Sequence, residues 1–121
     1  MILRTLFVLL LGGCVARNDN PAIPVAMQGL ATAWEEVAAA QSTEDLEAAV
    51  AHLRSAVDAA RSESYEGSAK GQRLYQEGME ALDAALSEVE GRLEDGDPDG
   101  ARAALDAVDE VHRRYHIKLW I

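Results

Sequence analysis

The sequence is poor in aromatic residues, and it lacks the alternation of apolar and polar residues that marks a half-buried strand. Its 121 residues include one phenylalanine, three tyrosines and two tryptophans, whereas alanine, leucine, glutamate and aspartate dominate. Few β-branched residues cluster together. This composition favours helix over sheet. The length predicts one domain of roughly a hundred residues.

Basic residues are also scarce. Eleven lysines and arginines face 21 aspartates and glutamates, which gives a formal net charge of −10. Such an acidic balance argues against nucleic acid or an anionic membrane face as a partner. We interpret most of the acidic residues as solvent-exposed positions on helix faces. Their combined negative charge could nevertheless steer a basic redox partner.

Cys14 is the only cysteine, so no internal disulfide can form, and a Cys-x-x-Cys-His motif for covalent haem attachment is absent. An apolar run over 5–11 follows Arg4 and is too short to span a bilayer. Together with Gly12-Gly13 it resembles a signal peptide that ends in the lipobox of bacterial lipoproteins. We therefore predict a signal peptide over 1–13 and a lipidated N-terminus and tether over 14–20, on the periplasmic face of a bacterial membrane. The absence of aspartate after Cys14 favours the outer membrane.

The rest of the chain, 21–121, carries four apolar stripes at helical spacing. The stripes are Met27, Leu30, Ala31, Trp34, Val37 and Ala38; Leu46, Ala49, Val50, Leu53, Val57 and Ala60; Leu74, Gly78, Leu82, Ala85, Leu86, Val89 and Leu93; and Ala101, Ala104, Leu105, Val108, His112, Tyr115, His116 and Leu119. Their connections are short, moderate and short, which places successive helices antiparallel. The predicted fold is all-α, an antiparallel up-down-up-down four-helix bundle.

Capping residues mark the ends of the predicted helices. Pro21 or Pro24 suits the start of the first helix, and Ser42 with Asp45 forms an approximate capping box for the second. The run Asp95-Gly96-Asp97-Pro98 combines a C-cap glycine, an N-cap aspartate and a proline at the first helical position.

Met27 lies near the start of the first helix and His116 near the end of the fourth, and the antiparallel topology brings these two ends together. Helical periodicity places both residues on core-facing stripes. A thioether and an imidazole form a known axial pair for haem iron. The alternative is that both residues are purely structural, the methionine packing in the core and the histidine lying at its rim.

Other chemistries have weaker support. His112-x-x-x-His116 could bind zinc or copper, but no third ligand is apparent in the sequence. Only Asp109-x-x-His112 matches the paired pattern of a di-iron bundle. No nucleophile–base arrangement is visible, so we do not expect an enzyme.

Three segments, over 27–30, 49–56 and 114–118, resemble the cytochrome b562 family, whose bundles bind haem between their helices. The similarity runs without gaps over 27–61 and 75–118. It implies one non-covalent haem b with Met27 and His116 as axial ligands. Further pocket positions implied by the resemblance are Leu30, Leu53, Tyr75, Met79 and Leu82. His112 and Trp120 stand where the best-known member has arginines at the haem edge, so His112 is also a candidate for the haem pocket.

The resulting prediction is a monomeric b-type cytochrome that transfers electrons in the bacterial cell envelope with an unidentified redox partner protein. The alternative is a haem-free envelope lipoprotein in which the same bundle serves as a scaffold or an interaction module.

Overall fold

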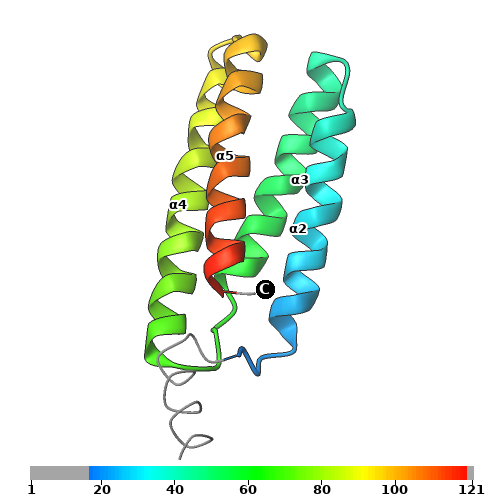
Figure 1. The fold of residues 1–121 in the computed structure, drawn as a ribbon. Helices are drawn as coiled ribbons and strands as arrows, with labels where there is room; N and C mark the ends of the chain where they lie inside the picture. The colour runs from blue at the N-terminus through cyan, green and yellow to red at the C-terminus, as the bar shows by residue number, and fades with distance from the viewer. Residues whose placement is uncertain (1–16, 120–121) are drawn as a thin grey trace, which may run out of the picture.

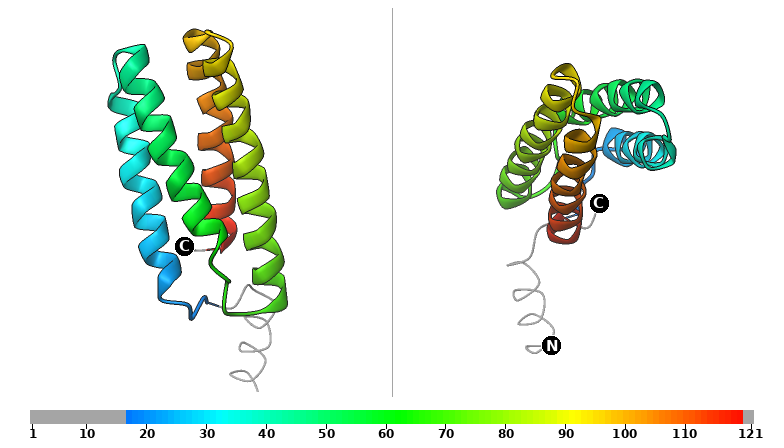
Figure 2. Two further views of the ribbon diagram at one scale, coloured as in Figure 1. Left: turned by 180° about the vertical axis from the view of Figure 1, so that it is seen from behind. Right: turned by 90° about the horizontal axis from the view of Figure 1, so that it is seen from above.

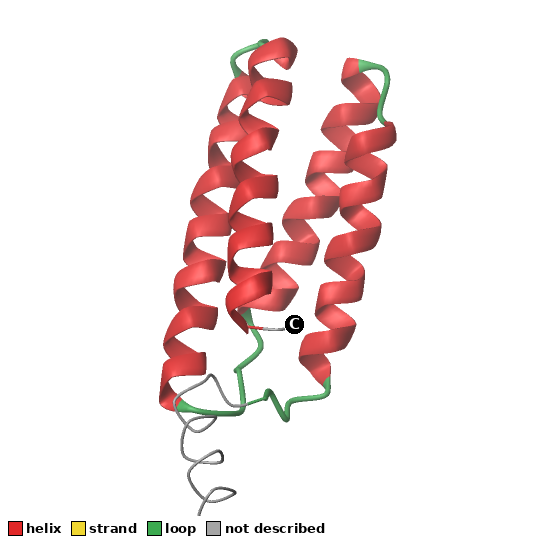
Figure 3. Cartoon of the chain, viewed as in Figure 1, coloured by secondary structure: helices red, strands yellow, loops and turns green. Residues whose placement is uncertain are grey.

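The computed structural model describes residues 17–119. The predicted signal peptide, Cys14 and Trp120 therefore lie outside the described residues. The described part consists of four helices and contains no strand: α2 (Ala22–Ala39), α3 (Thr43–Arg61), α4 (Ala69–Glu94) and α5 (Pro98–Leu119). Each helix runs antiparallel to the next (Figures 1 and 3). The predicted all-α four-helix bundle is confirmed.

The capping signals act where the sequence places them. The Ser42 side chain accepts a hydrogen bond from the Asp45 backbone N–H at 3.0 Å and opens α3. Between α4 and α5, Gly96 has a φ of +72°, a left-handed conformation that glycine adopts without a Cβ penalty. Pro98 is the first residue of α5, and the Asp97 carboxylate accepts from the Gly100 N–H at 2.9 Å. These local bonds satisfy backbone groups that have no partner within the helices.

The helices pack as two hairpins. α2 packs along α3, and α4 packs along α5, while contacts between α3 and α4 join the two pairs. α2 and α5 are not among the closely packed pairs. Figure 2 shows the same grouping from behind and from above. The seam between α2 and α5 is therefore the loosest side of the bundle.

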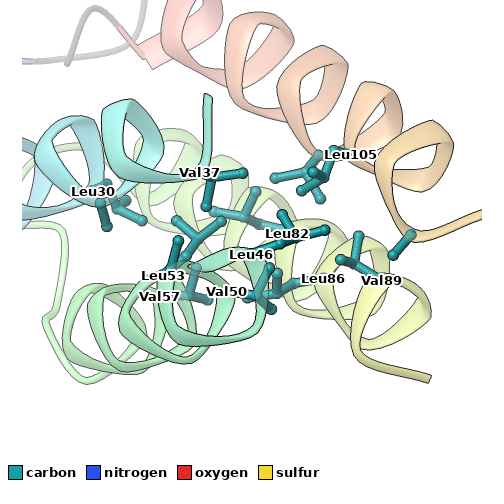
Figure 4. Packing of buried hydrophobic residues seen from close by; sticks show 14 of the residues in the cluster. Leu30, Val37, Leu46, Val50, Leu53, Val57, Leu82, Leu86, Val89 and Leu105 are labelled. Carbon is teal, nitrogen blue, oxygen red and sulfur yellow. The ribbon is translucent and has the colours of Figure 1, made fainter. Parts of the chain in front are cut away.

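Leucine and valine side chains from all four helices fill the main core (Figure 4). The most buried of them are Leu46, Val57, Leu86 and Val89. Each fully buried side chain of this size contributes about 1.5–3 kcal/mol by leaving water. Burial of these apolar stripes holds the helices together more than intrinsic helix propensity does.

The predicted stripe of the first helix is partly wrong. Ala31 and Ala38 are exposed in the structure, whereas Ala33 is fully buried. α2 packs closely against α3 but not against α5. The buried face of α2 is therefore narrower than that of a helix packed between two neighbours. Leu30, Ala33 and Val37 point to the core, and the side that carries Ala31 and Ala38 remains open to solvent.

A charged cluster joins α3 to α4. The Arg54 guanidinium donates from Nη1 to Asp83 Oδ1 at 2.5 Å and from Nη2 to Glu90 Oε1 at 2.6 Å. These bonds raise the pKa of Arg54 above its ordinary value, chiefly through the Glu90 carboxylate. Bidentate contacts of this kind are directional, so they fix the register of the two hairpins as well as their separation.

The segment before α2 is tied to the loop between α3 and α4. The Asp19 N–H donates to the Glu66 carbonyl at 2.6 Å, and the Glu66 N–H donates to Asn18 Oδ1 at 3.0 Å. The Asn20 side chain donates to the Ser64 carbonyl at 2.8 Å. The chain is thus held against this end of the bundle from residue 18 onward.

Candidate functional site

A small cavity lies at the end of the bundle where α2 begins and α5 ends. Its volume is about 20 Å³, and side chains from α2, α4 and α5 surround it. The lining residues are Met27, Tyr75, Gly78, Met79, Leu82, Val111, His112, Tyr115, His116 and Leu119. The structure therefore brings the Met27 side chain and the His116 side chain to one cavity, as the antiparallel topology predicts.

The two histidines are less buried than expected from their stripe. His112 and His116 are both exposed residues, and Met27 is half-buried. His116 was predicted to face the core, and it does line the cavity with Met27, but it remains exposed to solvent. Because α2 does not pack closely against α5, no neighbouring helix covers the outer side of these imidazoles. Both imidazoles line the cavity and are also exposed to solvent.

The imidazoles of His112 and His116 stack on successive turns of α5, with ring centroids 5.8 Å apart and planes inclined by 24°. Partial desolvation lowers the pKa of His112, and the neighbouring His116 lowers it further, against an opposing effect of Asp109. The lowered pKa favours the neutral form of His112, which is the form that binds metals.

Tyr75 closes the inner side of the cavity. Its hydroxyl donates to the Ala60 carbonyl at 2.5 Å, so the side chain connects α4 to the end of α3. Its ring lies 6.0 Å from that of Tyr65, which the sequence places in a loop but which is almost fully buried. Burial raises the pKa of Tyr75 to about 12, with a smaller contribution from Glu63.

Gly78 allows α4 and α5 to approach at the cavity. A Cβ added at Gly78 would lie 2.8 Å from Cγ and 3.1 Å from Cβ of Tyr115. These are the atoms closest to the α5 backbone, so they could not move aside without displacing the helix. The glycine within the apolar stripe of α4 is therefore explained by the position of the Tyr115 ring.

The pocket residues implied by the family resemblance divide into two groups. Tyr75, Met79 and Leu82 line the cavity, whereas Leu30 and Leu53 lie in the main core. The prediction omitted Val111 from the site, although it lines the cavity. Tyr115 and Leu119 share the stripe of His112 and His116, and that periodicity could have identified them as site residues.

A larger and open hollow, of about 1410 Å³, lies beside the end of α3 and the start of α4. It shares Tyr75, Met79 and Tyr115 with the cavity. Side chains of both charge signs line it, with Arg61 and Arg73 among several carboxylates. This mixed lining favours no charged ligand over another.

The side chains that line the cavity are suitable ligands and walls for haem, but the volume of the cavity is too small to hold it. A thioether and an imidazole reach it from α2 and α5, and the remaining walls are largely apolar, as a porphyrin requires. A space of about 20 Å³ holds no more than a water-sized group, so the walls must separate to admit a porphyrin. The loosely packed seam between α2 and α5 is the place where this separation disturbs the fewest contacts.

Over the described range, 17–119, no three histidine, cysteine, aspartate or glutamate side chains are grouped to hold a metal ion. Within the same range, none of the helices combines the length and apolar character needed to cross a membrane.

Comparison with known proteins gives one family. The family model described as Cytochrome b562 matches residues 23–119, which include all four helices of the bundle except the first residue of α2, and every residue that lines the cavity. A search of the curated proteins finds no match.

The raised pKa of Tyr75 predicts that the fold loses stability in alkali. The folded-state pKa of about 12 lies above the unfolded value of about 10, so the unfolded chain releases its proton first as the pH rises. The contribution is fully present below pH 10 and decreases as the pH rises toward 12. Urea unfolding followed by circular dichroism between pH 8 and 11.5 measures it, and Tyr75→Phe should flatten the decline. An equally steep decline in the Tyr75→Phe protein would assign the effect to another group.

Proposed function

Because the chain belongs to the cytochrome b562 family, whose members are haem-binding electron carriers rather than enzymes, we propose that it is a b-type cytochrome of the bacterial cell envelope. One haem is held without a covalent bond, with Met27 and His116 as its axial ligands. The observation that carries this proposal is the convergence of these two side chains, from helices at opposite ends of the sequence, on one cavity.

The residues of the cavity have distinct roles in this proposal. When bound, haem supplies an iron that takes up and releases one electron. His116 provides the stronger ligand from the last turns of α5, and the Met27 thioether favours the ferrous state and so raises the reduction potential. Leu82, Val111 and Leu119 would line the haem site and limit the access of water to it, which influences the reduction potential.

A haem titration tests the proposal. The full chain, expressed without haem and titrated with haemin, should bind one equivalent and develop a sharp Soret band. After reduction with dithionite it should show the resolved visible bands of a six-coordinate low-spin haem. A folded helical protein that remains colourless would instead support the haem-free scaffold.

We further propose that Cys14 carries a lipid and that the bundle lies on the periplasmic side of the membrane, with the outer membrane favoured. The support is the short apolar run that ends in Leu11-Gly12-Gly13-Cys14. Cys14→Ser should leave an uncleaved or soluble species with an unchanged haem spectrum. Cell fractionation and mass spectrometry measure both, and an unmodified Cys14 thiol in protein extracted from membranes would contradict the anchor.

A further inference from the structure

Sulfur and imidazole ligands are concentrated at the cavity to an unusual degree. Within residues 17–119 the chain has two methionines, Met27 and Met79, and both line the cavity. Two of the three histidines, His112 and His116, line it as well. Two thioethers and two imidazoles therefore reach one space from α2, α4 and α5.

The size of the space suits an ion. A cavity needs roughly 10–15 Å³ to hold one water molecule, and this one has about 20 Å³. In the geometry described, it can hold one monatomic ion, whereas a porphyrin requires the walls to move.

The character of the ligands selects the metal. Thioether sulfur is a soft ligand that prefers Cu(I), while imidazole also binds copper. Hard cations such as Mg²⁺ and Ca²⁺ require oxygen ligands, but no carboxylate lines the cavity, and that of Asp109, three residues before His112, is paired with Arg113 at 2.9 Å. A zinc site would require further nitrogen, oxygen or thiolate ligands, which are not grouped anywhere in the described residues.

The two imidazoles have the freedom to bind together. They lie one helical turn apart with ring centroids separated by 5.8 Å, and both are exposed, so small rotations can direct one nitrogen of each toward a shared ion. By contrast, the third histidine, His52, lies on α3 and is paired with Glu36 at 2.7 Å.

We propose that the haem-free protein binds one Cu(I) ion in this cavity through His112, His116, Met27 and Met79. The copper proposal does not require that the protein bind haem, and it adds His112 and Met79, which are not assigned as haem ligands, to Met27 and His116. Haem and copper nevertheless compete, since both require Met27 and His116. Binding involves coordination only and no change in the oxidation state of the metal.

The test is a competition for Cu(I) with the coloured chelator bicinchoninate, under ascorbate and without oxygen. Every protein is the full chain with Cys14→Ser, so that its thiol cannot bind the metal. The haem-free protein should remove one equivalent of Cu(I) from the chelator. His112→Ala, Met27→Leu and Met79→Leu should each weaken the affinity at least about tenfold. Leucine preserves the apolar volume at the methionine positions, and circular dichroism checks that the variants remain helical.

His52→Ala is the matched control and should bind Cu(I) as the parent does. X-ray absorption of the copper complex should show both sulfur and imidazole scattering. The copper site is disproved if the parent protein takes no Cu(I), if the two leucine variants bind as tightly as the parent, or if His52→Ala weakens binding as much as His112→Ala.

The two proposals can fail separately. A protein that binds haem but no Cu(I) would overturn the copper site alone, and one that binds Cu(I) but no haem would overturn the cytochrome alone. Haem-loaded protein should take no Cu(I), and uptake of a full equivalent by the haem-loaded protein would place the copper elsewhere. His112→Ala separates the two functions, because it should retain haem while losing copper.

Discussion

Replacement of His116 by alanine should remove most of the haem from the protein. Imidazole is the stronger iron ligand of the proposed pair, and no other side chain on the last turn of α5 can replace it. Haem titration followed at the Soret band measures the loss. His52→Ala, which removes an imidazole on α3 that is paired with Glu36, is the matched control and should bind haem normally.

The other cavity residues should respond differently. Met27→Ala should retain haem more weakly, shift the spectrum toward high spin and lower the reduction potential, because the thioether stabilises the ferrous state. His112→Ala should leave the low-spin spectrum largely intact. If His112→Ala abolished binding while Met27→Ala changed nothing, the axial ligands would have to be reassigned.

Leu53→Ala should lower the free energy of unfolding by about 2–5 kcal/mol. Leu53 is 2% exposed and packs in the main core rather than at the cavity, so its truncation leaves a void among buried apolar side chains. Urea unfolding of the haem-free protein measures the change without the stabilisation that a ligand adds to the native state.

Val25→Ala provides the comparison for this truncation. Val25 is 73% exposed, so its loss should change the free energy of unfolding by less than about 0.5 kcal/mol. The slope of the free energy of unfolding against urea concentration should be the same in both variants. A Leu53→Ala effect as small as that of Val25→Ala would place Leu53 outside the core.

Signals that act over a few residues made the helix ends predictable. Ser42 caps α3 through a bond to a residue three positions away, and Gly96 and Pro98 act through their own backbone conformations. None of these effects depends on the rest of the fold. The four helices and their antiparallel order follow from the same local information together with the lengths of the connections.

Side-chain burial was harder to predict, because it depends on which helices become neighbours. Ala31 and Ala33 are both small and apolar, and only the close packing of α2 on α3 decides which of them is buried. His112 and His116 lie on the apolar stripe of α5 but remain exposed, because α2 does not cover them. Tyr65 is buried through a ring contact with Tyr75, a partner ten positions away across a loop.

The same limit applies to the site. The sequence predicted Met27 and His116 as facing residues, because an antiparallel bundle places their helix ends together. The family resemblance added Met79 and His112, which line the same cavity, but the volume of about 20 Å³ could not be predicted, because it depends on how closely helices such as α4 and α5 approach at Gly78 and Tyr115.

The hydrogen bonds that hold residues 18–20 against the loop between α3 and α4 would limit the distance between the bundle and a membrane to which Cys14 is anchored. If Cys14 carries the lipid, only three residues lie between it and Asn18, and the four chain steps from Cys14 to Asn18 reach about 14 Å when extended. α4 alone has 26 residues and is about 39 Å long. The cavity lies at the tethered end, so any electron would have to be exchanged close to the lipid surface. A partner that is itself bound to that membrane, or one that approaches along it, would meet the haem, whereas a protein that docks on the distal loops would remain too far away.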